Sequence, residues 1–231
     1  MSRSNKGWQH LDSAGETRVA FFGKGLPREP GTELAARLPR GIEVAWAEQI
    51  HSAEVLAVES GSEWERQASA GRVGRGDALI THHRGLALLV FTADCVPVLL
   101  AGRDAVAAVH AGWRGLVAGV IPAALERLGE RPSVAWIGPA IGVGAYEVGP
   151  DVAEEVVRES DASVRVDHPG KRPHLNLQLA AEIQLRRAGV EDVRRVAACT
   201  FATENDLWSY RRDGSRAGRN LSLVWRQPVR S

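Results

Sequence analysis

Short, continuous apolar runs restrict the fold of this chain more than any other feature. Residues 86–91, 96–100, 105–109 and 134–137 are almost entirely apolar, and each run has the length of a strand rather than of a helix. The runs therefore predict buried β-strands. Further strands are predicted over residues 17–22, 42–50, 55–58, 193–200 and 221–225.

Helical patterns alternate with these strands. Residues 116–128 and 175–188 carry apolar side chains at helical spacing. The first pattern stops at Gly129 and the second at Gly189, which is typical of helix C-termini. Because strands and helices interleave along the chain, we expect an α/β (α+β) fold.

Four more segments complete the predicted elements. Residues 151–158 form an amphipathic helical pattern with Asp151 as N-cap, and residues 32–38 predict a short helix. Residues 61–76 are polar, contain glycine and lack periodicity, so they are expected to form a loop. Residues 213–218 predict a second, basic loop.

Composition limits the class of protein and the class of partner. With 44% hydrophobic residues and no internal repeat, residues 1–231 are expected to form a single domain. Lys and Arg number 29 against 28 acidic residues, so nothing points to nucleic acid or an anionic membrane as partner. No uncharged apolar run reaches the roughly 18 residues of a membrane span. The two cysteines, Cys95 and Cys199, suit a reducing, cytoplasmic compartment.

Three predicted strands end on side chains that can bind metals: His51, Cys95 and His110. Two histidines and one cysteine form a zinc-binding set with a fourth position left for water or substrate. Alternatively, the histidines are hydrogen-bonded in the core and Cys95 is an inert small hydrophobic residue. Spacing alone favours this alternative, because no C-x-x-C or H-x-x-x-H motif links the three. Asp94, beside Cys95, could orient an imidazole or cap the turn.

Arginines near glycine-containing turns form a second candidate site. Arg114 lies in the stretch HAGWRG, and the stretch SYRRDGSRAGR supplies Arg211, Arg212 and Arg219 as further candidates. Guanidinium groups and glycine backbone amides can cradle a phosphate or a carboxylate. A solvated basic loop explains the same residues, and taken alone they favour that explanation.

The order of these segments resembles one known family. The stretches QIHSAEV, GDALIT, TADCVP, HAGWRG, GAYEVGPDV, HLNL and SYRRDGSRAGRNLSLVW follow one another as in the laccase-domain (YfiH-type) family, over about residues 49–225. Its members were once labelled multicopper polyphenol oxidases. They are now described as purine nucleoside phosphorylases, and some as peptidoglycan editing factors.

The resemblance implies a layered sandwich with mixed β-sheets flanked by helices, and one zinc ion bound by His51, Cys95 and His110. With Asp94, these are then the candidate catalytic residues. The implied activity is phosphorolysis of adenosine and inosine, and in some members of methylthioadenosine, with adenosine deamination as a further activity. The partners are then a small nucleoside and phosphate, and copper could replace zinc at these ligands.

The candidate groups for substrate and phosphate are Lys24, Gln49, Arg114, Arg211 and Arg212. Lys24 stands in the stretch FFGKG, where family members often have arginine in F-F-T-R-x-G-G. Lysine keeps the positive charge but loses the two-pronged geometry of arginine, so anion binding at this position is expected to differ.

Two other functions stay open. Cys95 and His110, with His51 or Asp94 as orienting group, could form a thiol amide hydrolase that acts on a cell-wall precursor. The chain could also be a non-catalytic zinc-binding protein. Oxidation of phenols, in contrast, needs several coppers and many histidines, usually in H-x-H pairs, whereas this chain has 7 histidines and no H-x-H.

Overall fold

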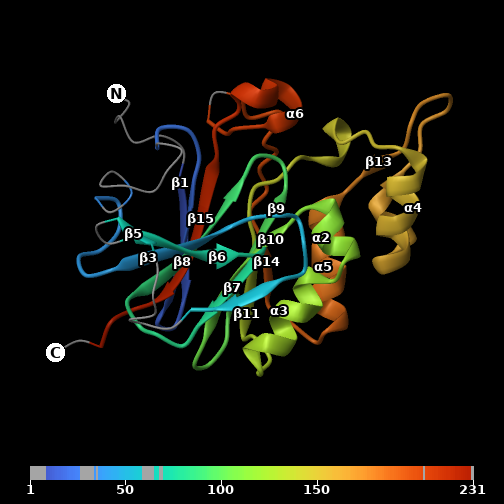
Figure 1. Ribbon diagram of the computed structural model, residues 1–231. Helices are drawn as coiled ribbons and strands as arrows, with labels where there is room; N and C mark the ends of the chain where they lie inside the picture. The colour runs from blue at the N-terminus through green and yellow to red at the C-terminus, as the bar shows by residue number, and fades with distance from the viewer. Residues whose placement is uncertain are drawn as a thin grey trace.

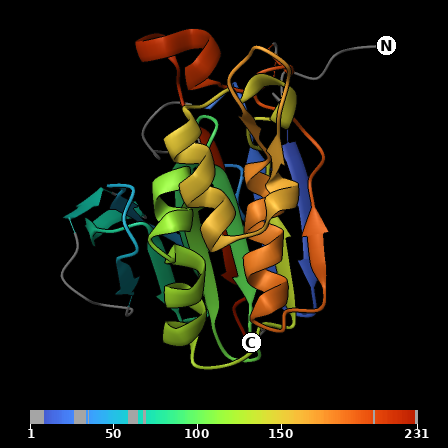
Figure 2. The ribbon, with the colours of Figure 1, turned by 90° about the vertical axis from the view of Figure 1, so that its right-hand side faces the viewer.

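The fold is a three-layer sandwich in which two β-sheets pack face to face and helices cover the outer face of one sheet (Figure 1, Figure 2). The computed structural model describes residues 9–26, 34, 36–58, 65–67, 70–204 and 206–229. Both large sheets contain parallel and antiparallel pairs. The predicted α+β sandwich with mixed sheets is therefore confirmed.

The first sheet has seven strands. They are β1 (Gln9–Ala14), β2 (Thr17–Phe22), β15 (Asn220–Arg226), β8 (Leu86–Thr92), β3 (Glu43–Glu48), β6 (Ala70–Arg75) and β5 (Glu65–Gln67), in that order across the sheet. β3 runs parallel to both of its neighbours, β8 and β6, whereas the other pairs are antiparallel. The last strand of the chain, β15, thus lies between two strands from its first half.

The second sheet has six strands. They are β14 (Val193–Arg195), β11 (Val134–Ile137), β9 (Val96–Ala101), β10 (Val106–Ala111), β7 (Ala78–Thr81) and β4 (Val55–Ala57), in that order. Every residue of β9 and β10 is buried, because these central strands are covered by the other sheet on one face and by helices on the other. The apolar runs that predicted buried strands are confirmed here.

The helices are α2 (Trp113–Val117), α3 (Val120–Leu128), α4 (Pro150–Glu159), α5 (Leu177–Arg187) and α6 (Tyr210–Asp213). α3 and α5 contact the six-stranded sheet, α4 packs against α2, and α6 lies at one end of the sandwich (Figure 1). Short elements complete the chain: β12 (Arg165–Val166), β13 (His174–Leu175), and the 3-10 turns η1 (Val143–Ala145), η2 (Ala162–Val164) and η3 (Gly214–Arg216).

Successive side chains of the central strands point to opposite faces of the sheet and so contribute to two apolar cores. Leu99 points from β9 into the core between the sheets, where it meets Trp136 and Leu88. Its neighbours Val98 and Leu100 point the other way, into the core beneath the helices. Each fully buried side chain of this size contributes about 1.5–3 kcal/mol, so the two cores together hold β9 and β10 rigidly in the middle of the molecule.

Three predicted elements differ in extent. The helix predicted over residues 116–128 is divided into α2 and α3, because Gly119 has a φ of 81° and cannot continue a right-handed helix. The loop predicted over residues 61–76 contains β5 and β6, which are the last two strands at one side of the seven-stranded sheet, with β5 at its edge. The strand predicted over residues 193–200 ends at Arg195, because its partner β11 ends at Ile137.

Other differences concern helix ends and missed strands. The N-cap of α4 is Gly149 rather than Asp151, which lies in the first turn after Pro150. The predicted basic loop 213–218 contains η3, and β1 and β7 were not predicted. Of the predicted helix 32–38, residues 32, 33 and 35 lie outside the described residues. None of the helices that the structure describes is long and apolar enough to cross a membrane.

Candidate metal centre

His51, Cys95 and His110 come together from three separate parts of the chain. His51 follows β3, Cys95 lies in the turn between β8 and β9, and His110 is near the end of β10. Their ligand atoms all lie within 4.8 Å of one another. His51 Nε2 is 3.9 Å from Cys95 Sγ, and the two imidazole rings meet edge to face with centroids 4.9 Å apart. The structure thus gathers the three side chains that the sequence singled out.

The backbone beside two of these ligands is in the left-handed conformation. His51 has a φ of 60°, and Asp94, which precedes Cys95, has a φ of 98°. No other non-glycine residue among those described has a positive φ. Such conformations cost about 1–3 kcal/mol each, so the surrounding contacts must hold them.

Asp77 holds both histidines in place. Its buried carboxylate accepts hydrogen bonds through Oδ1 from the His51 N–H (2.9 Å) and from His110 Nδ1 (2.8 Å). Oδ2 accepts from the N–H groups of Ile50 (3.2 Å) and Ser52 (2.6 Å), and from the Ser52 hydroxyl (2.8 Å). One carboxylate therefore fixes the backbone of one ligand and the ring of the other. It also leaves His110 Nε2 available to a metal.

Asp77 was not among the predicted site residues. It lies in the stretch GDALIT, directly before the four buried residues of β7. A carboxylate placed at the start of a buried apolar strand needs partners, and that requirement is the signal that could have identified it. Its partners are 25 to 33 positions away, so local spacing does not reveal them.

Charges within the cluster favour a thiolate. Burial raises the pKa of the Cys95 thiol, but hydrogen bonding with His110 and His51 outweighs burial and brings this pKa to about 6. Burial lowers the pKa of His110, but hydrogen bonding with Asp77 and Cys95 raises it to about 9. Burial opposes ionisation of Asp77 too, yet His110 and Ser52 hold the pKa of this carboxyl well below its usual range. The thiolate is the form of cysteine that binds metals.

The donor set fits a metal ion of the size of zinc. Bonds of about 2.0–2.3 Å in tetrahedral geometry separate the ligand atoms by about 3.5 Å. The His51–Cys95 distance of 3.9 Å is near that value, and the upper limit of 4.8 Å for the cluster requires closure by about 1 Å. Three protein ligands with one open position are typical of catalytic sites, whereas structural zinc sites have four.

Gly112 is packed against two of the ligands. A Cβ at this position would lie 3.0 Å from Cys95 Sγ and 3.1 Å from His51 Cδ2. We expect Gly112→Ala to weaken metal binding about 10- to 100-fold, as is common when the support of a ligand is disturbed. Titration of metal against a competing chelator measures the change. Gly144→Ala is the control, because a Cβ there meets open space. Equal affinity in both variants would show that the site tolerates a methyl group at Gly112.

The hydrogen bonds of Asp94 lead away from the histidines. Oδ1 accepts from the Thr200 hydroxyl (2.6 Å), and Oδ2 accepts from the Arg211 N–H (2.7 Å). Asp94 therefore fastens the turn that carries Cys95 to the segment around α6. The residue that orients an imidazole in this structure is Asp77, in place of the predicted Asp94.

Arg114 presents a free cation near the ligands. It lies two residues beyond Gly112, is exposed, and has its guanidinium 4.5 Å from the centroid of the Trp113 ring. Within the ranges that the structure describes, no hydrogen bond or ion pair occupies this guanidinium. Arg219, in contrast, donates to the carbonyls of Ala217 and Gly218. Arg114 is therefore available to an anion.

Arg211 is attached to the segment that follows η1. It donates to the carbonyls of Ala145 (3.4 Å) and Glu147 (3.0 Å), and its Cζ lies 5.2 Å from the centroid of the Tyr146 ring. The two terminal nitrogens of its guanidinium are thus engaged with protein.

Arg212 has no donor left for a substrate. Nε and one terminal nitrogen grip the Asp213 carboxylate at 2.8 and 2.7 Å. The remaining N–H groups donate to the carbonyls of Thr200, Phe201 and Leu207. All five donors of a guanidinium are then used. In this structure Arg212 closes the turn before α6, whereas the sequence offered it as a phosphate-binding residue.

Lys24 and Gln49 also have partners within the protein. The Lys24 ammonium donates to the Glu204 carbonyl and lies 4.6 Å from the centroid of a Trp208 ring. The Gln49 amide both donates to and accepts from the backbone of Phe91, at 2.7 Å each, and so extends the pairing of β3 with β8. The structure therefore gives both residues a role in holding loops and strands together.

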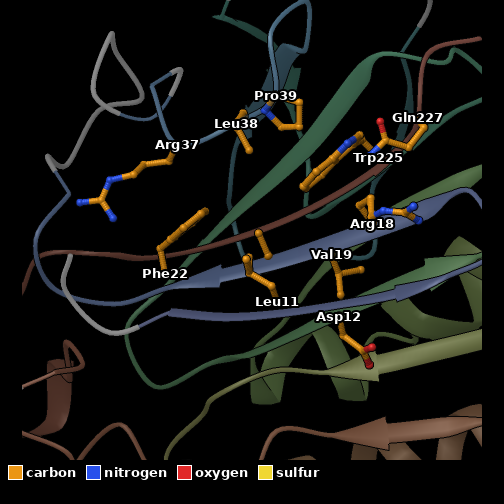
Figure 3. A pocket seen from close by; sticks show the side chains of 11 residues that line it. Leu11, Asp12, Arg18, Val19, Phe22, Arg37, Leu38, Pro39, Trp225 and Gln227 are labelled. Carbon is orange, nitrogen blue, oxygen red and sulfur yellow. The ribbon is translucent and has the colours of Figure 1, made fainter. Parts of the chain in front are cut away.

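A cavity of about 310 Å³ lies apart from this cluster, against β1, β2 and β15 (Figure 3). Its lining is mainly apolar, with Leu11, Phe22, Leu38 and Trp225, and none of the three ligands lines it. It belongs to the seven-stranded sheet and gives no reason to move the candidate site away from the ligands.

Proteins of similar sequence carry one functional name. The "Purine nucleoside phosphorylase YfiH" of Shigella flexneri is 35% identical over 220 residues, covering 93% of this chain and 81% of that protein. The "Purine nucleoside phosphorylase SCO2081" of Streptomyces coelicolor is 41% identical over 203 residues, covering 84% of this chain and 80% of that protein.

A solved structure and a family model agree with these matches. The crystal structure of Neisseria meningitidis protein NMB0706 superposes with a TM-score of 0.80 at 28% identity, covering 96% of this chain and 100% of that one. The family model described as multi-copper polyphenol oxidoreductase laccase matches residues 31–227, so the chain belongs to this family, as the resemblance implied.

Proposed function

We propose that the protein is a zinc-dependent purine nucleoside phosphorylase. It would cleave adenosine or inosine, and methylthioadenosine as a further substrate, with phosphate to the free base and ribose 1-phosphate. The convergence of His51, Cys95 and His110 carries this proposal, together with the unoccupied guanidinium of Arg114, which is two residues from Gly112 in the same stretch as His110. The names of relatives that cover most of the chain support the general activity.

Phosphorolysis transfers a ribosyl group from a base nitrogen to a phosphate oxygen. The C1′–N9 bond breaks with its electron pair going to the base, a C1′–O bond forms, and the proton lost by hydrogen phosphate ends on the base. Positive charge builds on the ribose in the transition state, so an anion held beside C1′ is stabilising. Arg114 binds that anion through its guanidinium fork.

Three side chains would hold the zinc: His51, Cys95 and His110. When bound, the zinc supplies a Lewis acid that can orient phosphate or ribose oxygens. Asp77 keeps the imidazole of His110 in the tautomer that presents Nε2. A free thiolate ligand suits a reducing compartment, so we place this enzyme in the cytoplasm.

Two further candidates follow from particular observations. The three-ligand set with an open position also suits adenosine deamination. The Cys95 thiolate beside His110, which Asp77 orients, also resembles a thiol hydrolase triad that would act on an amide such as a cell-wall precursor. The three candidates differ in their need for phosphate and for metal.

Chromatography of inosine and adenosine, incubated with the protein with and without phosphate, tests the proposal. Phosphate-dependent release of hypoxanthine and adenine is expected. Conversion of adenosine to inosine without phosphate would replace phosphorolysis by deamination. If neither nucleoside changes, the phosphorylase proposal fails.

Metal removal is the accompanying prediction. Dialysis against a chelator is expected to lower base release at least about 100-fold, because the Lewis acid contributes several kcal/mol to the transition state. Adding back zinc should restore the rate, and the metal-free protein treated with magnesium is the control. Full activity after verified metal loss would favour the thiol chemistry of Cys95 instead.

A further inference from the structure

Tyr146 occupies a fixed position beside the candidate site. It follows η1, is half-buried, and packs with Trp113 against the core beneath the helices. Its carbonyl accepts a hydrogen bond from the Leu175 N–H at 3.1 Å. The main chain of Tyr146 is therefore tied to β13, and its ring is held by the core.

Arg211 clamps this tyrosine from the solvent side. It donates to the carbonyls of the residues immediately before and after Tyr146, while its guanidinium covers the Tyr146 ring. The backbone of Arg211 is in turn bonded to Asp94, the neighbour of Cys95. A continuous series of contacts thus connects the turn that carries a metal ligand with the position of one phenol ring.

The hydroxyl of Tyr146 has no hydrogen-bond partner in the part of the chain that the structure describes. Burial and the charge of Cys95 raise the pKa of this phenol to about 12, while Arg211 and Arg114 act in the opposite direction. The hydroxyl thus keeps its proton at neutral pH and can donate. The Arg211 guanidinium lies 5.2 Å from the centroid of this ring, and the Arg211 backbone is bonded to Asp94 beside Cys95, so the phenol belongs to the same group of contacts as the turn that carries a metal ligand.

We propose that the Tyr146 hydroxyl donates a hydrogen bond to an oxygen of the phosphate that Arg114 attracts, and that Arg211 is the positioning residue that holds Tyr146 for this contact. The inference rests on the proposed phosphorolysis and adds a specific phosphate-binding group to it. Phosphate fits better than the base, because the positive charges of Arg211, which covers the Tyr146 ring, and of Arg114 favour a negatively charged ligand.

Kinetics with each substrate varied in turn tests the role of Tyr146. Tyr146→Phe removes only the hydroxyl, and the phosphate KM is expected to rise about 10- to 100-fold, the effect of one hydrogen bond to a charged group. The KM for inosine should stay within about twofold. Tyr210→Phe makes the same chemical change at the other tyrosine, which is 61% exposed on α6, and should change neither value. An unchanged phosphate KM in Tyr146→Phe, or a rise in the inosine KM instead, would overturn the inference.

The role of Arg211 is tested by a double-mutant cycle. Arg211→Lys keeps the charge but cannot donate to two carbonyls at once. It should raise the phosphate KM as Tyr146→Phe does. In the double variant, the fold-increase in the phosphate KM should be much smaller than the product of the two single increases. If the increase in the double variant equals the product of the two single increases, Arg211 does not act through Tyr146.

Failure of the proposed function can be separated from failure of this inference. If the wild-type protein releases no base, phosphorolysis is excluded, and binding of inorganic phosphate to the zinc-loaded protein then decides the role of Tyr146. A dissociation constant about 10- to 100-fold weaker in Tyr146→Phe supports the contact. Equal dissociation constants for the two proteins overturn it.

Discussion

The Cys95→Ala variant is expected to purify without metal and without phosphorolytic activity. The substitution removes the only anionic ligand of the three, and two histidines alone retain a zinc ion poorly. We expect less than about a tenth of the wild-type metal content after dialysis, and a fall in kcat of at least about 100-fold. Elemental analysis and nucleoside chromatography on the same preparation measure both effects.

Cys199→Ala is the matched control for this variant. Cys199 accepts hydrogen bonds from the N–H groups of Gly142 (3.1 Å) and Ala202 (3.4 Å), but it is not part of the ligand cluster. Its replacement should leave the metal content at the wild-type level. Phosphorolysis that persists in metal-free Cys95→Ala protein would remove the metal from the mechanism.

Replacing Asp77 by asparagine is expected to destabilise the fold and weaken metal binding together. Both carboxylate oxygens accept hydrogen bonds, so an NH₂ group in either position would face donors that it cannot satisfy. Because the group is buried among these donors, we expect a loss of about 3–5 kcal/mol in the free energy of unfolding. Metal affinity should fall about 10- to 100-fold, because His110 and the His51 backbone both lose their support.

Urea denaturation and metal titration of Asp77→Asn measure the two effects. Asp167→Asn is the control, since Asp167 forms an exposed ion pair with Arg165 and should cost less than about 1 kcal/mol. A variant that loses stability but binds metal normally would show that Asp77 supports the fold without positioning the ligands. Wild-type behaviour in both measurements would contradict the assigned role entirely.

The sequence was sufficient to predict the strands and strand ends that can be identified from residues adjacent in the chain. Uninterrupted apolar runs identified β8, β9 and β10, and the ends of these strands and of β3 pointed to His51, Cys95 and His110. The strands β5 and β6 were missed, because residues 61–76 are polar, contain glycine and lack the alternation that indicates a half-buried strand.

Partners that are distant in sequence explain why the contacts of other candidate residues could not be predicted. An arginine that binds phosphate and one that closes a turn have the same side chain, so Arg212 could be assigned only when its five acceptors were in place. Asp94 was considered because it adjoins Cys95 in the chain, and Asp77 was not considered at all. The carboxylate that contacts His110 is 33 positions away from it.

The unequal support of the two histidines has a consequence for metal exchange. The His110 ring is buried and bonded to Asp77, whereas His51 is exposed and held by Asp77 only through its backbone N–H. The imidazole of His51 can therefore rotate without disturbing the core. We therefore expect a metal ion to enter and leave past this ring, so that the rate of loading depends on the motion of one surface side chain and requires no opening of the sandwich.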